Sequence, residues 1–118
     1  MFIPMYARLL STESLYLNLT DCQFTERGME YHSNRSVTAS GLTCQRWDRQ
    51  YPHSHNFTDS ANFPDHNLSD AANFCRNPDG RASGPWCFTV DPGILWESCR
   101  ISRCQGASIV IVCHNIFA

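Results

Sequence analysis

The chain has 118 residues, a formal net charge of −2 at pH 7, and arginine as its only cationic residue other than histidine. This length has room for one domain with short flanks. Only 17% of the residues are charged, and no basic face stands out, so the composition gives no support for binding to nucleic acid.

Residues 1–21 are expected to form an N-terminal flank or linker. Pro4 and Arg8 interrupt the apolar stretch that a signal peptide requires. Residues 105–118 are apolar but shorter than the roughly 20 residues of a membrane span, so no direct membrane insertion by this chain is expected. We interpret both ends as cut from a longer protein or as non-native sequence.

Four Asn-x-Ser/Thr sequons are candidate sites of N-glycosylation. Each is a weak signal by itself, but four in a short, cysteine-rich chain favour a secretory route and would place the sequons on surface loops. The candidate residues are Asn18, Asn34, Asn56 and Asn67.

Between residues 22 and 104, turn-forming Gly, Pro, Asn and Asp are frequent and helical periodicity is almost absent. Two short strands are predicted at residues 86–90 and 95–99, which are rich in aromatic and β-branched residues. The Asp91-Pro92-Gly93 turn between them predicts a β-hairpin. The rest of this region is expected to be ordered loop.

Six of the seven cysteines lie within residues 22–104: Cys22, Cys44, Cys75, Cys87, Cys99 and Cys104. They allow 15 disulfide pairings, among which spacing alone does not choose. No Cys-x-x-Cys pair accompanies His53 and His55, so disulfides are favoured over zinc, and no metal or cofactor is expected. Such disulfides require an oxidising compartment, and we expect the chain to be secreted or part of an ectodomain.

Cys113 is the odd seventh cysteine and lies in the apolar tail. It could pair with another chain, or it could be an accident of where the chain ends. We favour the second interpretation.

Several motifs at fixed spacing within residues 22–104 resemble those of a kringle domain. The matching pieces are Gly28, Tyr31, Ser40-Gly41, Cys44-Gln45-x-Trp47, Pro52-His53-x-His55, Asn62-Phe63-Pro64, Asn73-Phe74-Cys75-Arg76-Asn77-Pro78-Asp79, Gly84-Pro85-Trp86-Cys87-Phe88-Thr89 and Trp96-Glu97-x-Cys99. Two features depart from the family pattern. Ser33 stands where kringles often have glycine, and the stretch 56–72 is longer than in compact kringles.

The resemblance implies a small disulfide-rich domain, mostly loops with short antiparallel β-hairpins. It also implies the pairing Cys22–Cys104, Cys44–Cys87 and Cys75–Cys99. Trp47, Phe63, Phe74 and Trp86 would pack around the crossed disulfides as the core.

Many kringles bind a lysine side chain in a shallow cleft, and the resemblance assigns this cleft to seven residues here. The aromatic trough would be Trp86, Phe88 and Trp96, and Asp79 would be the first carboxylate. Arg81 stands where the second carboxylate is expected, while Phe57 and Leu95 stand at positions that often carry cations.

An arginine beside the remaining carboxylate opposes the binding of an ammonium group. We therefore expect weak or absent binding of free lysine analogues. The alternative is that Arg81 points into solvent and Asp79 works with Glu97 or Asp91. Trp96 and Phe88 are expected to form an exposed aromatic platform for protein contacts.

The run at residues 50–58, followed by Phe63-Pro64, is similar to the kringle of Ror-type receptor tyrosine kinases, which lies outside the cell. This favours a non-catalytic, extracellular protein-interaction module of a cell-surface signalling receptor. The alternative is a lysine-docking module of a secreted kringle-bearing serine protease or related plasma-type protein. No enzyme is expected, because the chain has no Gly-x-Ser-x-Gly and no recognisable activated nucleophile.

Overall fold

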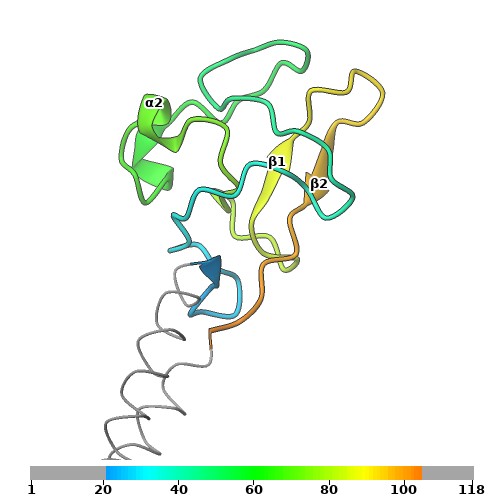
Figure 1. The fold of residues 1–118 in the computed structure, drawn as a ribbon. Helices are drawn as coiled ribbons and strands as arrows, with labels where there is room; N and C mark the ends of the chain where they lie inside the picture. Colours follow the sequence, from blue (N-terminus) through cyan, green and yellow to red (C-terminus); the bar gives the residue numbers. More distant parts are fainter. Residues whose placement is uncertain (1–20, 105–118) are drawn as a thin grey trace, which may run out of the picture.

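The computed structural model describes residues 21–104, which form loops wrapped around one short β-hairpin (Figure 1). Asn18, Cys113 and most of the expected flanks lie outside these residues. The first and last described segments run side by side, joined by a parallel bridge between Gln23 and Arg103. None of the helices in residues 21–104 is long and apolar enough to cross a membrane.

The hairpin consists of β1 (Trp86–Phe88) and β2 (Trp96–Ser98), which pair antiparallel with Phe88 opposite Trp96. The predicted hairpin is confirmed, but both strands are shorter than expected. The hairpin pairing ends after the bond from the Thr89 amide to the Leu95 carbonyl, because the amide of Val90 bonds to the carbonyl of Thr43 instead. The Thr89 hydroxyl then donates to the Ile94 carbonyl at 2.5 Å and holds the turn together.

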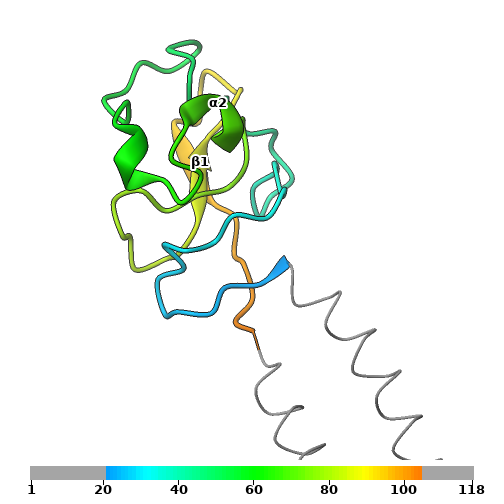
Figure 2. The same ribbon diagram turned by 90° about the vertical axis from the view of Figure 1, so that its left-hand side faces the viewer.

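Strand β1 lies at the centre of the domain (Figure 2), and all three of its residues are buried. One of its edges pairs with β2. The other is covered by single bridges from Arg76 to Trp86 and, just past the strand, from Cys44 to Thr89. Strand β2 pairs with β1 along one edge and accepts a hydrogen bond from the Ala39 amide at the Ser98 carbonyl on the other. Its residues are exposed or half-buried.

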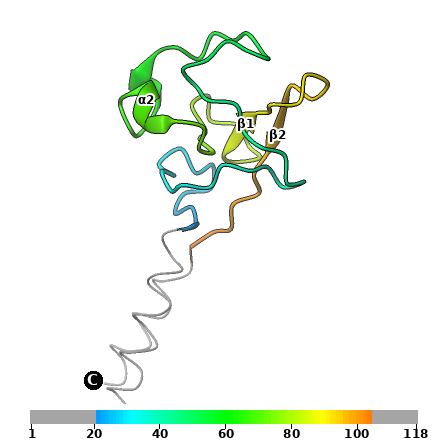
Figure 3. The same cartoon turned by 45° about the horizontal axis from the view of Figure 1, so that its top comes forward.

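Two short helical segments occupy the long stretch that was expected to be loop. They are the 3₁₀ turn η2 (Ser60–Asn62) and the helix α2 (Leu68–Ala71), which lie to one side of the hairpin (Figure 3). The Asn67 side chain caps α2 by accepting hydrogen bonds from the amides of Ser69 and Asp70. The helix stops at Ala72, whose φ of 49° cannot continue it.

Three disulfides join Cys22 to Cys104, Cys44 to Cys87 and Cys75 to Cys99, as the family resemblance implied. The last two are buried and cross at the centre, with the Sγ atoms of Cys44 and Cys75 4.0 Å apart. Four cysteine Sγ atoms therefore cluster within 4.8 Å of one another, and all four belong to these two disulfides.

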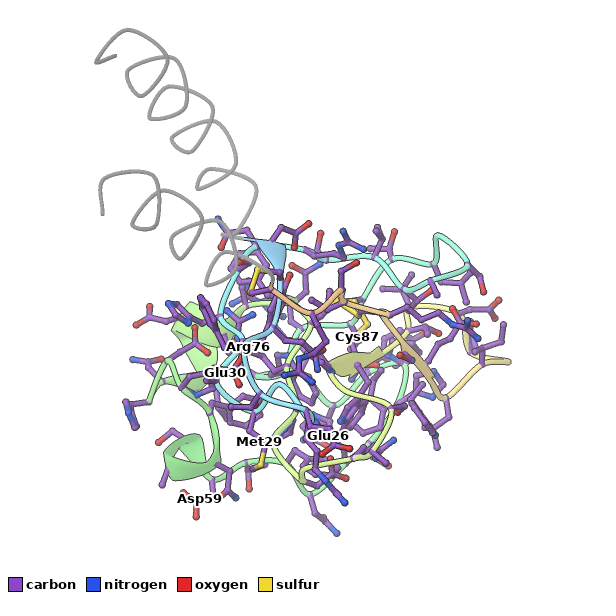
Figure 4. All side chains as sticks on the ribbon, turned by 90° about the horizontal axis from the view of Figure 1, so that it is seen from below. Glu26, Met29, Glu30, Asp59, Arg76 and Cys87 are labelled. Carbon is purple, nitrogen blue, oxygen red and sulfur yellow. A yellow bond between two sulfur atoms is a disulfide. The ribbon has the colours of Figure 1, made fainter. Side chains whose placement is uncertain are left out.

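The aromatic core around the disulfides is Trp47, Phe63 and Trp86, each at most 1% exposed. Phe74 was predicted to belong to it but is only half-buried. Its ring lies 5.4 Å from the guanidinium of Arg76, so it shields a buried charge rather than filling the centre. Figure 4 shows Arg76 among the packed side chains, whereas Asp59 projects at the edge of the domain.

Candidate functional site

The aromatic residues of the predicted cleft share one face of the hairpin. Side chains two residues apart on a strand point the same way, so Trp86 and Phe88 lie together, and Cys87 points to the opposite face and its disulfide. Trp96 lies directly opposite Phe88 in the register and joins them. The Trp86 and Trp96 ring centroids are 5.7 Å apart, in an edge-to-face arrangement.

Phe88 is buried, at 6% exposure, so the prediction that it belongs to an exposed platform is wrong. The imidazole of His55 covers it, stacked with ring centroids 4.9 Å apart. His55 is fixed by two backbone contacts: its Nε2 contacts the Arg49 carbonyl and its Nδ1 accepts from the Phe57 amide. Trp96 remains 39% exposed.

The loop after the buried Asn77 positions the two charged residues of the cleft. The Asn77 side chain accepts a hydrogen bond from the Arg81 amide and donates to the carbonyls of Arg27 and Arg81. Gly80 occupies the left-handed region at φ 65°, which allows the tight turn between Asp79 and Arg81. Both charged side chains therefore project from an ordered turn.

The guanidinium of Arg81 fills the aromatic trough. Its Cζ lies 3.6 Å from the Trp86 ring centroid and 4.2 Å from that of Trp96. Its Nε donates to Asp79 Oδ2 at 2.8 Å, and Trp86 Nε1 donates to Asp79 Oδ1 at 3.1 Å. A cation of the chain itself thus takes up the carboxylate and the aromatic surface that a lysine ligand would need.

The alternative arrangement, with Arg81 in solvent and Asp79 paired to Glu97 or Asp91, is not found. Glu97 stands opposite Cys87, on the other face of the hairpin, and accepts from the Ser40 hydroxyl and amide. Hydrogen bonds from Thr38 and Ser40 lower the pKa of the Glu97 carboxyl. The Asp91 carboxylate accepts from the Gly93 amide within the hairpin turn.

The two positions where kringles often carry cations, Phe57 and Leu95, are both apolar here. Their surroundings differ. Phe57 packs against the core, with its ring centroid 5.3 Å from that of Trp86. Leu95 is 52% exposed beside Trp96 on the hairpin. Neither side chain can pair with the carboxylate of a lysine-like ligand.

Sequence reasoning missed that Arg81 lies between two tryptophans and that His55 covers Phe88. The charge reversal at Arg81 was visible in the sequence, and an Asp two residues before an Arg on a turn is the signal for their pairing. The stacking of Arg81 on Trp86 and Trp96 could not be predicted from the sequence, because this stacking depends on the hairpin register.

Three of the four predicted sequons lie within the described residues. Asn34, Asn56 and Asn67 are all exposed. Asn67 also caps α2 through its Oδ1. Its Nδ2, the atom to which a glycan attaches, is not the atom that caps the helix.

The crossed buried disulfides, the single hairpin and the aromatic face define a small, disulfide-stabilised interaction domain. A family model of the Kringle domain matches residues 22–104, and the chain belongs to the kringle family. Kringle domains are non-catalytic modules that mediate protein interactions and are typically extracellular.

Proposed function

We propose that this domain is an extracellular protein-interaction module that does not dock on lysine, and that it belongs to a cell-surface signalling receptor. The observation that carries the first part is the position of Arg81 between Trp86 and Trp96, bonded to Asp79. A ligand ammonium would have to displace a cation that is already stacked and hydrogen-bonded.

The energetic comparison favours the resident arginine. An incoming ammonium gains one or two charge-assisted hydrogen bonds, each on the order of 1.5–3 kcal/mol. It must first break the bond from Arg81 to Asp79 and expose two indole faces, which offsets most of that gain. The apolar Phe57 and Leu95 add nothing for the carboxylate of a zwitterionic ligand.

The exposed apolar side chains beside this site support protein contact. Ile94, Leu95 and Trp96 are 38%, 52% and 39% exposed and are consecutive on the hairpin. Tryptophan is enriched among the residues that dominate protein interfaces, and contiguous exposed apolar side chains mark contact sites. We propose Trp96 and Leu95 as the centre of the contact surface.

The receptor context rests on the similarity of residues 50–58 and Phe63-Pro64 to Ror-type kringles. The alternative, a docking module of a secreted protease, requires a lysine cleft that Arg81 fills here. A kinase domain encoded in the same transcript would support the receptor proposal, and a serine protease domain would refute it.

The exposed sequons support a secretory origin. We propose that Asn34, Asn56 and Asn67 carry N-glycans, together with Asn18 outside the described residues. Asn56 directly precedes Phe57, so a glycan there would stand at the rim of the aromatic face.

The test is a calorimetric titration of the oxidised chain with 6-aminohexanoate. We expect no saturable heat at micromolar ligand and at most a weak response at millimolar ligand. Saturable binding with a micromolar Kd would refute the proposal and place the domain in the lysine-docking class.

A further inference from the structure

The guanidinium of Arg81 still has donors to offer. An arginine carries five N–H donors, and among residues 21–104 the only hydrogen bond of this guanidinium is the one from Nε to Asp79. Its side chain is 24% exposed, so its terminal amino groups can reach a ligand at the surface. Stacking on Trp86 and Trp96 orders these donors in advance, which lowers the entropy lost when they bind.

The charges around this position favour an anion. Asp79 is neutralised by Arg81, and both of its carboxylate oxygens already accept hydrogen bonds. A second cation, Arg27, donates from Nη1 to the Gly80 carbonyl at 2.6 Å, which places another guanidinium against the same turn. Two guanidinium groups and one carboxylate therefore meet here, with Glu97 on the opposite face of the hairpin.

We infer that the site has the reverse polarity of a lysine cleft and binds a carboxylate of a protein partner, held by the terminal amino groups of Arg81. The partner residue next to that carboxylate is apolar and packs on the exposed surfaces of Trp96 and Leu95. This inference rests on the proposed function, for which it names the partner chemistry. The apolar rim favours a peptide carboxylate over a sulfated glycan, which offers no apolar surface.

The experiment uses two six-carbon probes of opposite charge and similar apolar length. Hexanoate and hexylamine are each titrated into the oxidised, full-length chain at constant ionic strength. Binding is followed by tryptophan fluorescence and by the NMR shifts of the Trp86 and Trp96 indole N–H groups and the Arg81 Nε–H group. We expect hexanoate to bind with a Kd in the millimolar range and hexylamine to bind more weakly.

Three substitutions test the role of the guanidinium. Arg81→Gln is expected to weaken hexanoate binding about tenfold or more, as loss of one charge-assisted hydrogen bond predicts. Arg81→Lys keeps the charge but loses the planar fork, so it should weaken binding less. Arg49→Gln removes an exposed arginine elsewhere on the domain and should leave binding unchanged.

Each other outcome would overturn the inference. Tighter binding of hexylamine would show a cation site and would also count against the proposed function. No response to either probe would refute the carboxylate site, but it would not contradict the proposal that the domain does not dock on lysine. Saturable binding of a heparin oligosaccharide that Arg81→Gln abolishes, without a response to hexanoate, would assign the anion to a glycan instead.

Discussion

At the scale of single residues, Arg81 occupies the aromatic face of the hairpin. Its guanidinium is bonded to Asp79 and stacked on Trp86 and Trp96. A lysine-type cleft needs the same carboxylate and the same aromatic surface with the cation absent. We propose that this one side chain prevents lysine docking without any change in the kringle fold.

Replacing Arg81 with aspartate should open the cleft. The Arg81→Asp variant removes the resident cation and supplies a second carboxylate, so 6-aminohexanoate should bind at least about tenfold more tightly than to the unmodified chain. Calorimetric titration measures this difference. Arg49→Asp makes the same charge change at an exposed position and serves as the control. Equal affinities in the two variants would contradict the proposed role of Arg81.

Arg76 is a charge of a different kind, because it is buried. Its side chain is 1% exposed and pairs with Asp65 through bonds of 2.8 and 3.0 Å. Its Nη1 also donates to the carbonyls of Ser33 and Cys75. The Arg76 side chain therefore ties the loops at Asp65 and Ser33 to the segment that bridges to Trp86.

Removing Asp65 should be costly, because it leaves the Arg76 charge buried and uncompensated. Asp65→Ala is expected to lower the free energy of unfolding by about 3–5 kcal/mol, measured by urea denaturation. Asp48→Ala breaks an exposed pair with Arg46 and should cost less than about 1 kcal/mol. Similar costs for the two variants would show that the Arg76 pair contributes no more than a surface pair.

At the scale of elements, α2 exists because of its cap rather than its length. A helix of four residues cannot form alone. Asn67 satisfies two of its free amides, and Ala71 and Leu68 anchor it to the core. The same asparagine is a candidate glycan site, so its two roles have to be separated.

Aspartate at position 67 separates them. Asn67→Asp keeps an oxygen acceptor at the N-cap but destroys the sequon, whereas Asn67→Ala destroys both. In the unglycosylated chain, we expect Asn67→Ala to lower the free energy of unfolding by about 1 kcal/mol and Asn67→Asp to leave it nearly unchanged. If the site is glycosylated, both variants lose one glycan in mass spectrometry after secretion from eukaryotic cells. Equal stability losses in the two variants would contradict the capping role.

At the scale of the whole molecule, the disulfides replace the large core that a chain of this size cannot build. Loop-closure entropy assigns about 4.5 kcal/mol to Cys22–Cys104, which spans 82 residues, and about 3.4 kcal/mol to Cys75–Cys99, which spans 24. The burial of the two disulfides predicts the opposite order of stabilisation. Cys75 and Cys99 are at most 1% exposed, whereas Cys22 and Cys104 are half-buried.

We therefore expect removal of Cys75–Cys99, which closes the shorter loop, to destabilise the domain more than removal of Cys22–Cys104. The Cys75→Ala/Cys99→Ala variant loses the stabilisation from loop closure and also leaves a cavity. The cavity lowers the free energy of unfolding further, on the order of 1 kcal/mol per buried sulfur. The Cys22→Ser/Cys104→Ser variant loses mainly the stabilisation from loop closure. Calorimetric melting of both should give the lower Tm for the first. The opposite order would show that loop length outweighs core packing here.

Much of the fold could be predicted from the sequence, because cysteine spacing and turn residues are local signals. The family resemblance supplied the disulfide pairing, and the Asp91-Pro92-Gly93 turn located the hairpin. The burial of Phe88 could not be predicted, since it depends on His55 folding back from a separate loop. The stacked position of Arg81 was equally hidden, because Trp86 and Trp96 meet only through the strand register.

The most direct test of the central claim is the NMR environment of the Arg81 side chain. A guanidinium lying over two indole rings experiences strong ring currents, so the Arg81 Nε–H and Cδ–H protons should be shifted well upfield, and Trp96→Ala should remove part of that shift. Arg49, 70% exposed, provides the reference in the same spectrum. Ordinary arginine shifts for Arg81, unchanged by Trp96→Ala, would show that the trough is open and would contradict the proposal that Arg81 prevents lysine docking.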